Sequence, residues 1–193
     1  MLQINPNQKT DITLTIKTTV IDPEKDFTDG EDILAIIKRI TDGDNTSKNE
    51  ILELLGEEAV SDIELCTEAE LAVNDKGCVE ISYIENEDDE QIKTLSKIIF
   101  HPRSPGLVVM TKEGAMKAIL SFEEGRTHIC TYDTPFMPIK VYVDANRVDN
   151  RLLSSGTLKL NYVLHLNDTP PQHFIVEVKI KESPEDTIKN ILS

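Results

Sequence analysis

Apolar and polar residues alternate along most of the chain. Between Thr10 and Ile21, the residues Ile12, Leu14 and Ile16 fall on one face, and mostly threonines fall on the other. A period of two is typical of a β-strand with one buried face. The same alternation returns at Asp62 and continues to Lys181 with only short interruptions. The pattern predicts about eight to ten strands.

Short turns rich in glycine, proline and asparagine separate the expected strands. After residue 61 these strands are 62–73, 79–83, 92–100, 107–110, 116–122, a strand that runs through Tyr132, one that starts at Ile139, 157–167 and 174–180. No helix is expected between strands in this part of the chain. A long antiparallel meander normally closes into a barrel, because closure removes exposed strand edges. The sequence therefore predicts a mainly β protein, an antiparallel up-and-down β-barrel, as a single domain over residues 1–193.

One segment departs from the period of two. Residues 24–60 carry two capping-box patterns, at Thr28–Glu31 and Ser47–Glu50, each followed by isoleucines or leucines at helical spacing. The spacing predicts a helical hairpin inserted after the first strand. A further cap at Ser183 predicts a short helix at the C-terminal end of the sequence.

The inward faces of the expected strands carry mostly large apolar side chains. A closed barrel of this size is either filled by its own side chains or holds one small ligand. We expect a partly open cavity at one end, below the turn at residues 134–138. The candidate ligand-binding residues are the aromatic side chains of the barrel interior: Tyr83, Phe122, Tyr132, Tyr162 and Phe174.

Charge is distributed unevenly along the chain. The formal net charge is −15, and residues 22–90 hold 23 acidic and 5 basic residues. Such a surface repels nucleic acid and anionic membranes. Either the acidic surface only keeps the protein in solution, or the acidic insert at 24–60 binds a protein partner. We expect neither a nucleic-acid partner nor a membrane partner.

The cysteines indicate the compartment. Cys66, Cys78 and Cys130 are odd in number and lack a close pair, which favours reduced thiols in the cytoplasm. The first ten residues have neither the basic run nor the apolar run of a signal peptide. No apolar stretch reaches the length of about 20 residues that a membrane-spanning helix needs.

A family resemblance rests on a few motifs near the middle of the chain. Phe122 and Gly125 form an F-x-x-G pattern, Tyr132-x-Thr134-Pro135 follows, and a strand containing Tyr162 lies further on. These motifs resemble the YwiB-like family of small bacterial proteins of unknown function. The chain departs from the family pattern at Met137, where the family usually has glycine, and in the insert at 24–60.

The resemblance implies a calycin-like (lipocalin-like) β-barrel and a cytoplasmic bacterial protein. It covers residues 10–21 and 62–181, which is most of the chain. Its motifs are structural ones, so it implies no catalytic residue.

Three groups of residues are candidates for a chemical site. Residues 42–53 have oxygen ligands at several calcium-loop positions, but Ser47 replaces the glycine that such a loop needs. His128 and Cys130 share a strand face, yet no third group is placed to orient them as base and nucleophile. His165 and His173 flank a turn, but a zinc site needs three or four ligands, so we expect the two histidines to be a solvated pair. We therefore expect no catalytic residue, metal or cofactor, and an enzyme is not favoured.

Two classes of function remain. The first is a protein that holds a small apolar or amphipathic ligand inside the barrel. The second is a non-enzymatic interaction module with a filled barrel that presents the acidic hairpin at 24–60 to a partner. The volume of the barrel interior distinguishes the two.

Overall fold

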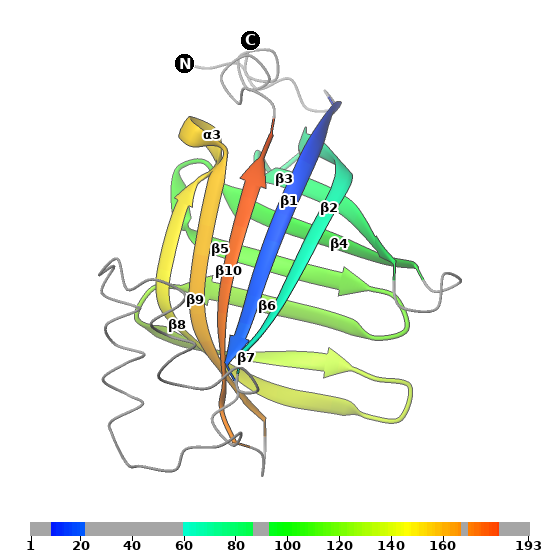
Figure 1. The fold of residues 1–193 in the computed structure, drawn as a ribbon, viewed down its shortest axis with the longest axis vertical. Coiled ribbons are helices and arrows are strands. Elements are labelled where there is room, and N and C mark those ends of the chain that lie inside the picture. Colours follow the sequence, from blue (N-terminus) through cyan, green and yellow to red (C-terminus); the bar gives the residue numbers. More distant parts are fainter. Residues whose placement is uncertain (1–8, 22–59, 87–92, 167–169, 182–193) are drawn as a thin grey trace.

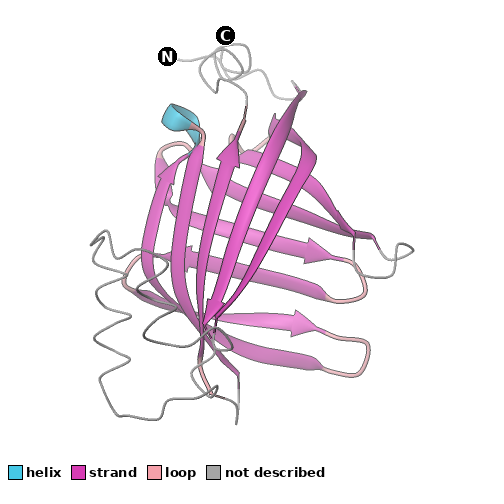
Figure 2. Ribbon diagram, viewed as in Figure 1, coloured by secondary structure: helices cyan, strands magenta, loops and turns pink. Residues whose placement is uncertain are grey.

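The computed structural model describes residues 9–21, 60–86, 93–166 and 170–181. The described elements are β1 (Lys9–Ile21), β2 (Val60–Val73), β3 (Val79–Asn86), β4 (Lys93–His101), β5 (Ser104–Glu113), β6 (Lys117–Glu123), β7 (Arg126–Asp133), β8 (Pro138–Arg151), α3 (Leu152–Ser155), β9 (Thr157–Leu166) and β10 (Gln172–Ile180). Figure 2 shows that strands make up nearly all of this part of the chain.

The ten described strands form one closed barrel. Each strand pairs antiparallel with the next along the chain, and β10 pairs with β1 to complete the circle. The predicted antiparallel up-and-down barrel is therefore confirmed. In Figure 1, β1, β2, β9 and β10 run steeply down the view, whereas β3 to β7 run across it.

The structure corrects three details of the predicted element boundaries. β5 starts at Ser104 and ends at Glu113, so it is longer than the expected strand over 107–110. One helical turn, α3, joins β8 to β9, where no helix was expected. Val60 begins β2 and so does not belong to the insert. The rest of the insert at 24–60 and the expected C-terminal helix lie outside the described residues.

Two residues, a buried leucine and a glycine after the last turn, favour helix α3 at this position. Leu152 is 1% exposed and points into the barrel end, which anchors the turn by burying an apolar side chain. Gly156 ends the helix with a φ of 69°, a left-handed conformation that glycine adopts without steric cost. This short run of residues carries too little periodic pattern to be recognised as a helix from sequence.

One end of the barrel, which we call the closed end, is densely packed. The turns at 74–78, 102–103 and 124–125 and helix α3 lie at this end. Apolar residues here have almost no exposed surface, and examples are Leu14, Ile81, Ile98, Val108, Phe122, Leu158 and Leu160. Interiors packed in this way leave few gaps larger than a water molecule.

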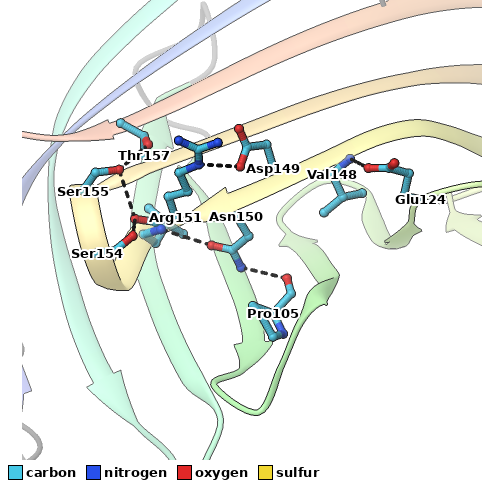
Figure 3. Close-up of polar contacts among 10 residues, drawn as sticks. Pro105, Glu124, Val148, Asp149, Asn150, Arg151, Ser154, Ser155 and Thr157 are labelled. Atoms are coloured by element: carbon cyan, nitrogen blue, oxygen red, sulfur yellow. Dashed lines mark hydrogen bonds and ion pairs between the residues drawn. The ribbon is translucent and has the colours of Figure 1, made fainter. Parts of the chain in front are cut away.

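Polar contacts tie the closed end together across the barrel (Figure 3). The Asn150 side-chain amide donates to the carbonyl of Pro105 at the start of β5, with a distance of 3.1 Å. The N–H of Val148 donates to the carboxylate of Glu124 in the turn between β6 and β7, also at 3.1 Å. These bonds join β8 to the start of β5 and to the turn between β6 and β7, so they link segments that are distant in the sequence.

At the other end, which we call the open end, the ladder between β2 and β3 is incomplete. β2 has 14 residues but pairs with β3 over only five positions, from Ala69↔Tyr83 to Val73↔Val79. Beyond Ala69 the two strands diverge, and Figure 1 shows the wedge between them. The turn between β5 and β6 also lies here, and Gly114 packs so closely on Thr94 that a Cβ at residue 114 would overlap that side chain.

Within the described residues, no helix is long and apolar enough to span a membrane.

Candidate functional site

A cavity of about 380 Å³ lies inside the barrel at the open end. Its wall includes Lys112 and Ala118, which face each other across the β5–β6 hairpin, and Tyr132, which precedes the turn at 134–137. The predicted place of the cavity, below the turn at 134–138, agrees with this position. Apolar residues form most of the rest, among them Ile16, Val20, Ile63, Leu65, Met110, Leu120 and Val176.

The strand registers explain why these side chains point inward. Tyr83 on β3 stands opposite Ser96 on β4, which stands opposite Lys112 on β5, and Lys112 stands opposite Ala118 on β6. Residues that are directly opposite in a ladder point to the same face of the sheet. One continuous belt of inward positions therefore runs around the cavity.

Aromatic side chains build one side of the cavity. The rings of Tyr162 and Phe174 stack with their centroids 5.0 Å apart and their planes at 7°. Phe122 lies 4.8 Å from Tyr162, tilted by 56°, and has no exposed surface. Four of the five predicted binding residues, Tyr83, Tyr132, Tyr162 and Phe174, line the cavity, while Phe122 packs behind Tyr162.

A polar cluster stands on the opposite wall. Lys112 Nζ donates to Glu85 Oε2 at 2.7 Å, and Ser96 Oγ donates to Glu85 Oε1 at 2.9 Å. Both charged residues are only partly exposed, at 43% for the Lys112 side chain and 25% for that of Glu85. An ion pair in this position gives an otherwise apolar cavity one strongly polar region.

The tyrosines around the cavity are sheltered from water. Burial raises the pKa of Tyr83 well above its ordinary value, and the neighbouring carboxylate of Glu85 raises it further. Burial also raises the pKa values of Tyr162 and Tyr132. At neutral pH all three therefore present neutral hydroxyl groups, which can donate and accept hydrogen bonds.

Sequence reasoning missed the charged pair. Both residues lie just beyond the expected strands, Glu85 after 79–83 and Lys112 after 107–110. Yet the inward alternation Val79, Ile81, Tyr83 continues by two residues to Glu85, and that continuation is the signal that points to it. For Lys112 the signal is weaker, because the inward face of β5 can be fixed only from its register with β4.

The side chains of His128 and Cys130 are near different groups. The Cys130 thiol lies 4.0 Å from the backbone carbonyl of His128, and the His128 ring nitrogen Nε2 lies 3.8 Å from the Glu123 carboxylate. This nitrogen is buried and has no hydrogen-bond partner among the described residues.

The second histidine pair is only half solvated. His165 Nε2 lies 2.8 Å from Asp144 Oδ2 on the barrel surface. His173 is buried, and its Nδ1 atom has no hydrogen-bond partner, so the expectation of a solvated pair is wrong for this residue. Burial lowers the pKa of His173, and the charge of His165 adds to that effect.

In the part of the chain that the structure describes, no group of three or more His, Cys, Asp or Glu residues is arranged so that it could hold a metal ion. The calcium-loop candidate at 42–53 lies outside the described residues. The three cysteines are all free thiols, exposed at Cys66, partly exposed at Cys78 and buried at Cys130.

These features define the class of the protein: a closed, ten-stranded antiparallel barrel with an internal cavity at one end. A family model described as "Domain of unknown function (DUF1934)" matches residues 48–178. The chain belongs to this family, whose model covers more than half of it.

A solved structure shares the fold. The crystal structure of the ywiB protein from Bacillus subtilis superimposes with a TM-score of 0.58 at 18% sequence identity, covering 90% of this chain and 94% of that one. The expected resemblance to YwiB-like proteins is therefore confirmed at the level of the fold. No curated protein matches the sequence.

Proposed function

We propose that the protein binds a small amphipathic ligand in the cavity at the open end of the barrel. The observation that carries this proposal is the cavity itself, about 380 Å³ in volume, which lies within the range of roughly 300–1,000 Å³ typical of ligand sites. Ligand pockets are mostly apolar with a few placed polar groups, and this wall has that composition.

The wall suggests how the ligand is oriented. Its apolar body packs against the stacked rings of Tyr162 and Phe174, which present a flat surface. Its polar group lies against Glu85 and Lys112, since two hydrogens of the Lys112 ammonium remain available after the bond to Glu85. A ligand with an apolar chain or ring and one polar head meets both regions.

The test begins with the purified wild-type protein. Native mass spectrometry reports any co-purifying small molecule, and thermal unfolding is followed with medium-chain fatty acids, fatty amines and fatty alcohols. A ligand present at 100 times its dissociation constant stabilises the folded protein by about 2.7 kcal/mol. We expect at least one of these amphiphiles to raise the melting temperature in a concentration-dependent way.

A pair of variants locates the binding site. Ala118 is buried and lines the cavity, so the Ala118→Phe variant fills part of the cavity. The control is Ile119→Phe on the same strand, because Ile119 is 59% exposed and lies outside the cavity wall. We expect Ala118→Phe to abolish stabilisation by the amphiphile and Ile119→Phe to preserve it. If no amphiphile stabilises the wild type, or if both variants keep the effect, the cavity is not a binding site.

A protein partner at the acidic insert 24–60 is a second proposal, supported by the 11 acidic and 4 basic residues of that segment. The free thiols of Cys66, Cys78 and Cys130 support a further proposal, that the protein works in the reducing cytoplasm.

A further inference from the structure

Strand β2 is paired along one side only for much of its length. It pairs with β1 from Val60 to Ala72, but with β3 only from Ala69 to Val73. Over the stretch from Ile63 to Glu68, which we call the β2 edge, no described strand lies on the side away from β1. Such an edge offers unsatisfied backbone groups to an added strand.

The hydrogen bonds at the end of β2 show which backbone groups face this side. The N–H of Asn74 donates to the carbonyl of Cys78 at 2.9 Å, next to the Val73↔Val79 pair. In an antiparallel ladder, backbone groups of successive residues point to opposite sides. Even-numbered residues of β2 therefore direct their N–H and C=O groups toward β3, and odd-numbered residues direct theirs toward β1.

The side of β1 that faces β10 leads to the same assignment of backbone directions independently. The N–H of Lys181 donates to the carbonyl of Thr13 at 3.0 Å, so odd-numbered residues of β1 face β10. Even-numbered residues of β1 then face β2, where their register partners are odd-numbered. Glu64, Cys66 and Glu68 thus point their backbone groups into the wedge.

One of these groups has a local partner. The Thr67 hydroxyl donates to the carbonyl of Glu68 at 3.2 Å. The N–H groups of Glu64, Cys66 and Glu68 and the carbonyls of Glu64 and Cys66 have no such bond among the described residues. They form a row that one more strand can pair with.

The side chains of the β2 edge alternate in a way that selects the partner. Ile63 and Leu65 point to the cavity side, and Ile63 is 62% exposed although it is apolar. Glu64 and Glu68 point to the outer face. A cleft of about 480 Å³ continues the edge past Glu68, with Glu70, Ile84 and Leu95 among its walls.

We propose that the β2 edge binds an extended basic segment of a partner protein, which adds a strand to the barrel and alternates lysine or arginine with apolar residues. The basic side chains lie beside Glu64 and Glu68 on the outer face, and the apolar ones cover Ile63 and Leu65. Main-chain bonds supply the affinity in this mode of recognition, and the alternating side chains supply the specificity.

Charge favours this partner over a second copy of the chain. The whole of β2 holds four acidic residues and no basic one, so two β2 edges side by side would repel each other. The pair between Lys17 and Glu64, at 3.0 Å, does not block a basic segment, because ion pairs between exposed side chains contribute little to stability.

The first measurement is amide hydrogen exchange on the intact wild-type protein. Without a partner, we expect the amides of Glu64, Cys66 and Glu68 to exchange fast, and those of Leu65 and Thr67, which face β1, to exchange slowly. Adding a blocked peptide of alternating lysine and valine, about eight residues long, is expected to slow the three fast amides. If they are already protected in the free protein, the edge is occupied and the proposal fails.

Two matched peptides separate strand addition from simple charge attraction. One has the same sequence with methyl groups on alternate backbone nitrogens, which removes the donors but keeps the charge, and the other has glutamate in place of lysine. We expect each to bind at least about tenfold more weakly in fluorescence anisotropy, or about 1.4 kcal/mol. Equal binding of the methylated peptide, or self-association of the protein through β2, would overturn the proposal.

Variants at one position complete the test. Glu64→Pro removes an N–H on the open side, where proline is tolerated, and Glu64→Gln keeps the N–H but removes the charge. We expect the proline variant to lose the peptide and the glutamine variant to bind more weakly. The cavity variant Ala118→Phe should bind the peptide normally, so the test of the β2 edge does not depend on whether the cavity binds a ligand. Unchanged binding of the peptide by the Glu64→Pro variant would contradict the proposal for the β2 edge.

Discussion

The two ends of the barrel are built from the same alternating pattern and differ in what they enclose. At the closed end, Leu14, Phe122 and Leu158 have no exposed surface, and the Asn150–Pro105 bond ties β8 to β5. At the open end, β2 leaves β3 after five pairs, and a cavity of about 380 Å³ remains. The same inward apolar pattern makes a packed core at one end and leaves a cavity beside the wedge between β2 and β3 at the other.

Strand twist accounts for the wedge beside β2. Strands twist by roughly 20–25° relative to their neighbours, so two adjacent strands can pair over part of their length and then diverge. β3 leaves β2 at the Ala69↔Tyr83 pair, although β3 itself continues to Asn86. The cavity and the β2 edge lie in the wedge that results.

The largest expected effect is at the closed end. Phe122 has no exposed surface, so we expect Phe122→Ala to reduce the free energy of unfolding by about 3–5 kcal/mol, measured by urea denaturation. The matched variant at the open end is Phe174→Ala, which enlarges an existing cavity beside a partly buried ring. For this variant we expect a loss of about 2 kcal/mol. Equal losses would show that the two ends are packed alike.

The next effect tests whether the open end is sheltered from water. Because burial raises the pKa values of Tyr83, Tyr132 and Tyr162, the folded protein keeps these protons above pH 10, whereas the unfolded chain loses them. The unfolded state therefore gains stability as the pH rises past 10. We expect the free energy of unfolding to fall by up to about 1.4 kcal/mol per pH unit for each tyrosine.

The matched variant for this effect is Tyr162→Phe, which removes one of the three protons while keeping the ring against Phe174. It should make the fall in stability above pH 10 less steep. Absorbance at 295 nm in the folded protein provides the direct reading of tyrosinate. If all tyrosines ionise near pH 10 before the protein unfolds, water fills the open end and the cavity is accessible to solvent.

Much of the fold could be predicted because it is local in sequence. Period-two segments separated by short turns fix the strands and their antiparallel order, and the cost of exposed edges predicts closure. The same alternation placed Tyr83, Tyr132, Tyr162 and Phe174 on the inward face, and all four line the cavity.

The rest depends on contacts between distant strands. The wedge beside β2 arises because β2 and β3 diverge beyond the Ala69↔Tyr83 pair, and no local sequence pattern indicates that divergence. A lysine after an apolar run is also typical of a turn, and only the register of Lys112 with Ser96 places it on the inward face. Polar residues that end an inward face are thus the ones that sequence reasoning misses.

A smaller effect on the free energy of unfolding is expected from variants in two ion pairs of the same composition. Glu85 accepts from Lys112 at 2.7 Å and from Ser96 in the cavity wall, and Glu80 accepts from Lys97 at 2.7 Å and from Ser82 on the outer face. We expect Glu85→Gln and Glu80→Gln each to reduce the free energy of unfolding by about 1 kcal/mol. Only Glu85→Gln should change the stabilisation by a bound amphiphile, and an equal change in both would contradict a cavity-based site.

The smallest effect uses the cysteines as reporters of the two regions. Cys66 lies on the β2 edge, where Lys181 Nζ donates to its thiol at 3.1 Å and lowers its pKa, whereas Cys78 lies in a closed-end turn and Cys130 is buried. A lower pKa means more thiolate at neutral pH, and thiolate is the reactive form. We expect Cys66 to react first with iodoacetamide, followed by mass spectrometry, and Lys181→Gln to slow it severalfold without changing Cys78. Reaction of Cys66 and Cys78 at the same rate would mean that the β2 edge is as covered as the closed end, and it would remove the accessible strand on which the proposed partner depends.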